Sequence, residues 1–185
     1  MFKKLLLVGA ILTGMASFGQ EVDFGIQAGY TNVEGKSSNS LDNVSASGNS
    51  SGFYVGALAD FTLSESFHLQ PSVNYANADE VNFLVVPVLA QYYIENSGFY
   101  LQAGPQATLI LDDVSIAGVD VLNTFGLDLA FGAGYEINSN FFVEAKYSLE
   151  LTNRFSKEIR DAADTENVEV DSQFNALSIG LGYKF

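Results

Sequence analysis

Apolar residues alternate with small or polar residues through most of this chain. The clearest stretch is the last one, residues 173–185. Every second residue from Leu177 to Phe185 is apolar there, and the residues between them are small or polar. A period of two places one kind of side chain on each face of an extended strand. The pattern therefore predicts a chain built of amphipathic β-strands.

Charged residues follow the same alternation in eight segments, each near the length that a tilted membrane strand needs. The segments are 22–33, 52–62, 67–78, 82–94, 98–110, 122–136, 141–153 and 173–185. Their apolar parity carries no Asp, Glu, Lys, Arg or His. A basic residue at mid-bilayer depth on a lipid-facing site costs roughly 2–4 kcal/mol, so an uncharged face favours a strand in lipid. The charged strand residues all lie on the opposite parity: Asp23, Asp60, His68, Asp128, Glu136, Glu144, Lys146, Glu150 and Lys184.

The connections between segments are short at one end and mostly long at the other. Turn-like residues 64–66, 95–98 and 138–140 make the short ones, and the others are 34–51, 79–81, 111–121 and 154–172. Outer-membrane barrels have this asymmetry, with the short turns facing the periplasm. We expect each aromatic that closes a segment to meet the next opening aromatic across a short turn. The outer aromatic girdle is expected from Tyr30, Phe53, Tyr75 and Phe125.

Residues 1–19 have the pattern of a secretory signal peptide. Lys3 and Lys4 precede an apolar run and a small-x-small site at residues 17–19, with cleavage after Ala16 as the alternative. No later apolar run is long enough for a helical span. Residues 20–185 are therefore predicted to form one all-β domain, an eight-stranded antiparallel transmembrane up-and-down β-barrel in the bacterial outer membrane. A soluble lipocalin-like ligand-binding barrel, with the apolar faces inside, is the alternative.

Two stretches resemble known barrels. Residues 82–93, N-F-L-V-V-P-V-L-A-Q-Y-Y, resemble the fourth-strand signature of the PorT-like outer-membrane β-barrel family of Bacteroidetes-type envelopes. Val85 stands where that signature usually has Glu, and Gln91 where it has Lys. The last strand resembles that of bacterial outer-membrane barrels, which implies a barrel-assembly signal at Tyr183 and Phe185. The likeness implies fold and location, and some relatives assist protein secretion.

The candidate site is a set of charged residues on the inward parity. Eight-stranded barrels have interiors that side chains just fill, so we expect these groups to satisfy one another in a polar network. His68 is the only histidine, and the sequence places no partner beside it. No catalytic residue, cofactor-binding residue or metal ligand is predicted. The predicted network consists of Asp60, Asp128, Glu144, Lys146, Glu150 and Lys184.

The expected function is a non-catalytic structural or interaction role in the envelope, exerted through the outer loops. A narrow channel or a secretion-accessory barrel is the alternative, and the lone histidine disfavours an enzyme. Expected partners are outer-membrane lipid and lipopolysaccharide, the barrel assembly machinery and an envelope protein. Acidic residues outnumber basic ones 22 to 8. Nucleic acid is excluded as a partner, because phosphate binding needs clustered Lys and Arg.

Overall fold

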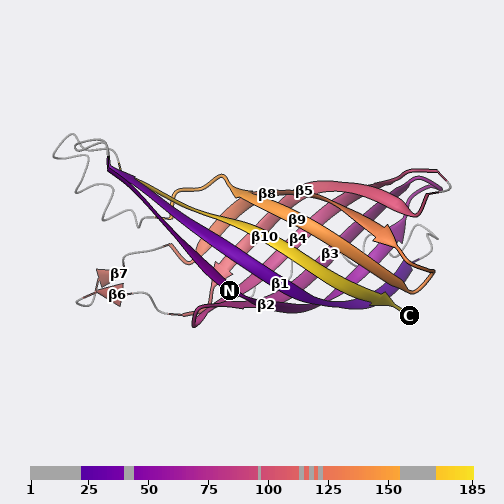
Figure 1. The fold of residues 1–185 in the computed structure, drawn as a ribbon, viewed down its shortest axis with the longest axis horizontal. Helices are drawn as coiled ribbons and strands as arrows, with labels where there is room; N and C mark the ends of the chain where they lie inside the picture. Colours follow the sequence, from indigo (N-terminus) through magenta and orange to yellow (C-terminus); the bar gives the residue numbers. More distant parts are fainter. Residues whose placement is uncertain are drawn as a thin grey trace, which may run out of the picture.

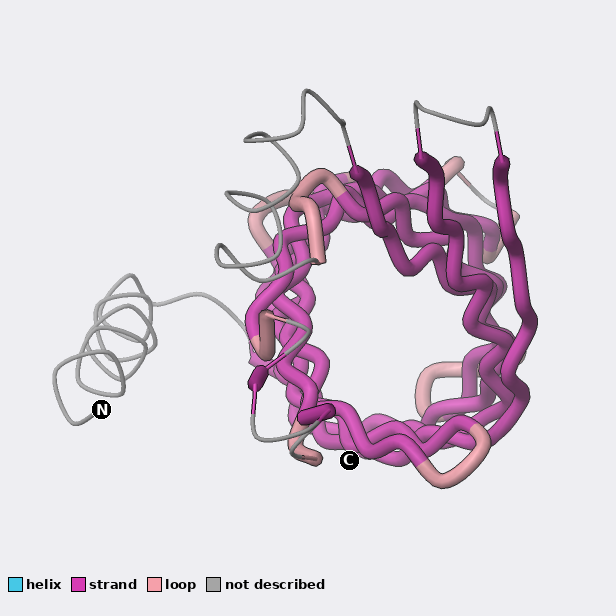
Figure 2. Tube along the Cα trace, turned by 90° about the vertical axis from the view of Figure 1, so that its left-hand side faces the viewer, coloured by secondary structure: helices cyan, strands magenta, loops and turns pink. Residues whose placement is uncertain are grey.

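Eight antiparallel strands close into a barrel in the computed structural model, which describes residues 22–39, 44–95, 97–112, 115–116, 119–120, 123–154 and 170–185. The order around the barrel is β1-β10-β9-β8-β5-β4-β3-β2 (Figure 1). Figure 2 shows the closed ring of strands. The barrel strands are β1 (Val22–Asn39), β2 (Val44–Thr62), β3 (Phe67–Ala78), β4 (Val81–Tyr93), β5 (Phe99–Ile110), β8 (Phe125–Glu136), β9 (Phe141–Glu150) and β10 (Val170–Lys184). A separate hairpin pairs β6 (Ser115–Ile116) with β7 (Val119–Asp120).

The up-and-down topology predicted from the sequence is confirmed. Neighbouring barrel strands are neighbours in the chain, apart from the inserted β6–β7 hairpin, and β1 pairs with β10 to close the ring. Across the described ranges, no helix is long and apolar enough to cross a membrane. The predicted signal peptide, residues 1–19, lies outside the described residues.

Side chains alternate between the outer surface and the lumen as the sequence parity predicts. Large apolar side chains cover the outside of the wall, among them Ile26, Val55, Leu101, Leu129 and Ile179. The charged residues of the predicted network are all buried. A soluble barrel would place these two sets the other way round, so the soluble alternative is wrong. Phe61 is an exception to the parity, because it is only 4% exposed although it was expected to face lipid.

Aromatic side chains gather near both rims of the apolar band. Tyr30, Phe53, Tyr75 and Phe125 are exposed near one rim, as predicted. At the opposite rim, three opening aromatics pack on the aromatic at the end of the neighbouring strand. The ring centroids are 5.1 Å apart for Phe67 and Tyr92, 4.6 Å for Phe99 and Tyr135, and 4.9 Å for Phe141 and Tyr183.

The expected contact across a short turn forms between β4 and β5 inside the lumen, where the Tyr93 and Tyr100 ring centroids are 5.0 Å apart. On the lipid-facing side the pairing differs from the expectation. Phe99 pairs with β8, at Tyr135, whereas Tyr92 lies opposite Leu101 on β5. The stagger of the strands moves each closing aromatic past the opening residue of the following segment. Parity alone contains no information about this offset.

Three strands continue well beyond the length predicted for them. β1 extends to Asn39, β2 begins at Val44 and β10 begins at Val170, so much of the predicted loop 34–51 is paired strand. β3 pairs with β2 only from Gly52, and β9 with β10 only from Ala176. Residues 34–39, 44–51 and 170–175 thus form a three-stranded extension that projects beyond the other strands (Figure 1). A polar composition predicts only that a segment is exposed to water. It does not distinguish a solvated strand from a loop, because both are exposed.

Pro71, Pro87 and Pro105 lie inside β3, β4 and β5 without any shift of register. The pairing of β3 with β4, for example, has the same offset at Pro71–Val88 and at Asn74–Val85. Each proline is paired to the following strand, and pairing to the preceding strand is interrupted beside it. The missing proline N–H explains the interruption.

Glycines opposite inward-facing aromatic rings make room for those rings. Phe142 pairs with Gly182 and Tyr100 pairs with Gly134 across neighbouring strands. A Cβ at either glycine would collide with the opposite ring. Both rings are almost completely buried, so they have little room to move away. The glycines are therefore required by close packing in the lumen.

We expect Gly182→Ala to destabilise the barrel by about 1–3 kcal/mol, because it overpacks the site against the buried Phe142 ring. The measurement is the urea midpoint of the protein refolded in lipid vesicles. Gly48→Ala is the matched control, since a Cβ there meets no atom within 4 Å. Equal midpoints for the two variants would contradict this account of the lumen.

Candidate functional site

Five polar residues from five strands meet in the lumen near the short turns. Lys184 Nζ lies 2.7 Å from Asp60 Oδ2 and 2.6 Å from Glu136 Oε1. His68 Nδ1 lies 2.9 Å from Asp60 Oδ1, and the Tyr93 hydroxyl donates a hydrogen bond of 3.0 Å to Glu136 Oε1. We call Asp60, His68, Tyr93, Glu136 and Lys184 the turn-end cluster. It joins β2, β3, β4, β8 and β10 across the lumen.

The turn-end cluster gives His68 the partner that the sequence did not identify. The β2–β3 register places Thr62 opposite His68, so Asp60 is a diagonal neighbour on the same face. Asp60 is 1% exposed, and both its carboxylate oxygens have a basic partner. His68 is thereby held by a carboxylate and by the Tyr93 ring, whose centroid is 4.4 Å away.

Buried aromatic rings form the next layer inward from the turn-end cluster. The centroids of Tyr93 and Tyr100 are 5.0 Å apart, and Lys184 Nζ lies 5.9 Å from the centre of the Phe142 ring. Tyr100 and Phe142 are among the largest fully buried side chains. Charged pairs and rings together fill this end of the barrel, as a narrow eight-stranded lumen favours.

A second group of charged residues lies farther toward the long loops. Lys146 Nζ is 2.5 Å from Glu144 Oε1, and Arg154 Nε pairs with Glu150 Oε1. Asp128 Oδ2 accepts hydrogen bonds from the Thr108 hydroxyl and from Gln106 Nε2. All five charged side chains are buried. We call this set the loop-end cluster: Asp128, Glu144, Lys146, Glu150 and Arg154.

The structure thus divides the six residues predicted from the sequence between two clusters. Asp60 and Lys184 belong to the turn-end cluster, and the other four belong to the loop-end cluster. Arg154 was missed, because it was assigned to an outer loop. Arg154 lies four residues after Glu150 and has the same inward parity. Extending the alternation of this segment by a few residues would therefore have predicted that Arg154 faces the lumen.

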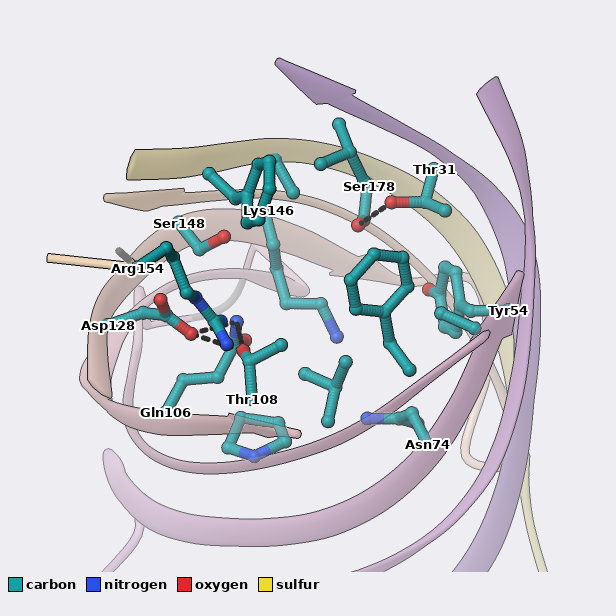
Figure 3. Close-up of a pocket in the computed structure, with 17 residues that line it drawn as sticks. Thr31, Tyr54, Asn74, Gln106, Thr108, Asp128, Lys146, Ser148, Arg154 and Ser178 are labelled. Carbon is teal, nitrogen blue, oxygen red and sulfur yellow. Dashed lines mark hydrogen bonds between the residues drawn. The ribbon is translucent and has the colours of Figure 1, made fainter. Parts of the chain in front are cut away.

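The loop-end cluster borders a lumenal cavity of about 70 Å³ (Figure 3). Asp128 and Arg154 lie on one side of it, Tyr54 and Asn74 on the other, and Lys146 reaches in between them. A wider pocket of about 350 Å³ shares Val33, Phe83 and Phe174 with the cavity and continues among the outer strand ends.

An inward apolar wall faces these charges, and it explains why residues 83–89 are apolar on both parities. Phe83 packs with Tyr54, Ala76 and Ile110 inside the barrel. Val85 packs against the same cluster, and Pro87 is fully buried. The wall is a feature of the lumen that parity reasoning, which expected polar residues inside, did not identify.

Most polar groups of the lumen are committed to one another. The ion pairs, amides and hydroxyls described above hold neighbouring strands together and fill the interior. In the part of the chain that the structure describes, no three His, Cys, Asp or Glu side chains lie close enough to hold a metal ion. Asp112, two residues after the end of β5, also has a partner: its carboxylate accepts a hydrogen bond of 2.5 Å from the Asn82 backbone N–H.

The comparisons with known proteins agree with this architecture. Residues 80–156 match the family described as outer membrane protein beta-barrel domain. The crystal structure of Neisserial surface protein A is 19% identical, with a TM-score of 0.53, over 89% of this chain and 99% of that chain. A second similar structure is that of Ail, the attachment invasion locus protein of Yersinia pestis, in complex with the heparin analogue sucrose octasulfate. It is 17% identical, with a TM-score of 0.52, over 89% of this chain and 99% of that chain. No curated protein matches the chain.

Three observations together decide where in the cell the protein lies: the uncharged apolar outer surface of the barrel, the aromatic rims and the family match. The protein is an integral outer-membrane barrel. The general orientation of such barrels places the short turns in the periplasm and the long connections outside the cell. With this orientation we expect the turn-end cluster at the periplasmic end of the lumen and the cavity in its outer half.

We expect Lys184→Met to destabilise the barrel by about 3–5 kcal/mol, because it removes the lysine that pairs with both the buried Asp60 carboxylate and Glu136. The measurement is the urea midpoint in lipid vesicles. Lys36→Met is the control: Lys36 forms an exposed pair with Glu34 at 2.9 Å, and its loss should leave the midpoint unchanged. An unchanged midpoint for Lys184→Met would show that the turn-end cluster contributes nothing to stability.

Proposed function

We propose that this barrel is a non-catalytic interaction protein of the outer membrane, which presents its three-stranded extension and outer loops to partners at the cell surface. One observation carries the proposal: the periplasmic end of the lumen is filled by the turn-end cluster and by the Tyr100 and Phe142 rings. A lumen closed in this way favours a scaffold over a conduit. The candidate partners are lipopolysaccharide and an envelope protein.

The composition of the extension supports contact with a polar surface. Its residues 34–39, 44–51 and 170–175 are mostly Ser, Asn, Gly and charged residues. Glu34 and Lys36 form an exposed ion pair at 2.9 Å, and Ser47, Gly48 and Asn49 are exposed. Because it is paired strand, the extension holds these groups at fixed spacing well beyond the apolar band.

We infer a closer relationship to the PorT-like barrels from residues 82–93. The two positions that differ from that signature are both inward. Val85 packs with the apolar wall, and Gln91 is buried with its Nε2 donating a hydrogen bond of 3.2 Å to Gln102 Oε1. An amide pair and an apolar contact thus stand where charged residues are usual. A secretion-accessory role follows from this likeness alone and is the second candidate.

The terminal aromatics fit the proposed assembly signal. Phe185 is 70% exposed, and the Tyr183 ring packs edge-on against it at 5.5 Å. Both lie on the lipid-facing parity at the periplasmic rim. The barrel assembly machinery is accordingly a proposed partner of this strand.

Conductance in a planar bilayer tests the closed lumen. We expect the refolded wild-type protein to give no conductance steps. The double variant Tyr100→Ala, Phe142→Ala should give small steps, since it removes two rings that fill the periplasmic half. Tyr135→Ala, which removes an exposed ring on the outer surface, is the control. Regular steps from the wild-type protein would favour the narrow channel instead.

Cysteine labelling on intact cells tests the presentation of the extension. The chain has no cysteine, so a single introduced thiol reports its own position. We expect Lys36→Cys to react with a membrane-impermeant maleimide on intact cells. Glu65→Cys, in an exposed short turn, should react only after the outer membrane is disrupted. The reverse pattern would place the extension in the periplasm and overturn the proposal.

A further inference from the structure

The loop-end cluster contains one carboxylate more than its basic residues can pair. Glu144 is paired with Lys146 and Glu150 with Arg154. Arg154 also donates from Nη1 to the backbone carbonyls of Asn123 and Thr124, at 3.3 Å each. Asp128 is left without a cation within ion-pair distance among the described residues. An unpaired buried charge is costly, so a positively charged partner would stabilise the Asp128 carboxylate.

The unpaired carboxylate lies at the edge of the cavity. Asp128 is 2% exposed, and both hydrogen bonds that it accepts, from Thr108 and Gln106, go to Oδ2. Its Oδ1 accepts no hydrogen bond from the described residues. In Figure 3 the Asp128 carboxylate lies beside the cavity, next to Gln106 and Thr108. A charged acceptor is thus buried at the wall of an empty space.

A second polar group in the cavity wall has only a weak partner. The Tyr54 hydroxyl is buried beside the Glu144 carboxylate, without a well-formed hydrogen bond to it. Tyr54 lines the cavity on the side opposite Asp128 (Figure 3). A buried hydroxyl without a hydrogen bond costs free energy, and a bound molecule would satisfy it.

The rest of the cavity favours an organic occupant. Ala76, Phe83, Val85, Pro87 and Phe174 supply apolar surface. A bare divalent cation needs several oxygen ligands, whereas this site offers one unpaired carboxylate. Ammonium groups bind favourably over the faces of aromatic rings. The Tyr54 and Phe174 rings of the cavity wall show that cations are accommodated beside such faces here. Lys146 Nζ is 5.5 Å from the centre of the Tyr54 ring, and Arg154 Cζ is 5.7 Å from that of Phe174.

We propose that this cavity binds a small amphipathic amine entering from the outside of the cell. The ammonium group pairs with Asp128, and the apolar body lies between Phe83 and Phe174. The cavity of about 70 Å³ holds the head group, and the wider pocket of about 350 Å³ that shares Phe83 and Phe174 accepts the tail. A carboxylate ligand is disfavoured, because Lys146 and Arg154 are already paired and a further negative charge would meet three carboxylates.

Calorimetry with three four-carbon probes tests the proposal. The refolded protein in nonionic detergent is titrated with n-butylammonium, n-butanol and butyrate, which differ in the charge of the head group. We expect saturable binding of n-butylammonium and weaker binding of the other two. Butanol binding as tightly as butylammonium would show that Asp128 presents no negative charge, and tighter binding of butyrate would reverse the assigned polarity. No saturable heat with butylammonium would also overturn the proposal.

Variants of the cavity wall then locate the site. Asp128→Asn keeps the shape and should weaken butylammonium binding by about tenfold to a hundredfold, as expected for the loss of a hydrogen bond to a charged group. Glu136→Gln changes a carboxylate of the turn-end cluster and should leave the affinity unchanged. Ala76→Leu fills the apolar side of the cavity and should block binding with Asp128 intact, which keeps the test decisive if Asp128→Asn does not fold. Unchanged binding by a folded Asp128→Asn or Ala76→Leu variant would place the amine elsewhere.

Discussion

Closure of the sheet between β1 and β10 is the constraint on which the rest of this structure depends. In the bilayer there is no water to satisfy backbone N–H and C=O groups, so a sheet that spans it must have no free edge. Pairing from Gly25–Lys184 to Asn39–Val170 removes that edge. The prolines of β3, β4 and β5 interrupt single ladders beside them, yet the register on either side is unchanged.

Closure also separates polar from apolar side chains, because one face of every strand must lie in lipid. Charged residues can then lie only in a lumen that side chains nearly fill, where each charge needs a partner. At the periplasmic end this need is met, since Lys184 bridges Asp60 and Glu136 and packed rings complete the layer. In the outer half it is met less fully, since Asp128 borders a cavity and has no cation within ion-pair distance among the described residues. The lumen is therefore packed at one end and holds a cavity in the other half.

Sequence reasoning succeeded where a rule of period two applies and failed where the outcome depends on register. The six charged residues of the predicted network are buried, and each lies on the inward parity of its strand. Sequence reasoning did not identify Asp60 as the partner of His68, since that contact depends on a diagonal across the β2–β3 hairpin. It also misassigned Arg154, residues 34–39 and residues 44–51, because polar residues near a rim have the same composition in a strand and in a loop.

The alternation of residues by itself determined that this chain forms amphipathic strands, that eight of them build a membrane barrel, and which side chains face the lumen. The requirement is local: each strand residue points to one face or the other, and lipid accepts no charge at mid-depth. The tertiary structure alone decided which charges meet, where rings pack over Gly134 and Gly182, and where the lumen stays open. Strand stagger and barrel closure set these contacts, because they bring together side chains that are as far apart in the chain as Asp60 and Lys184.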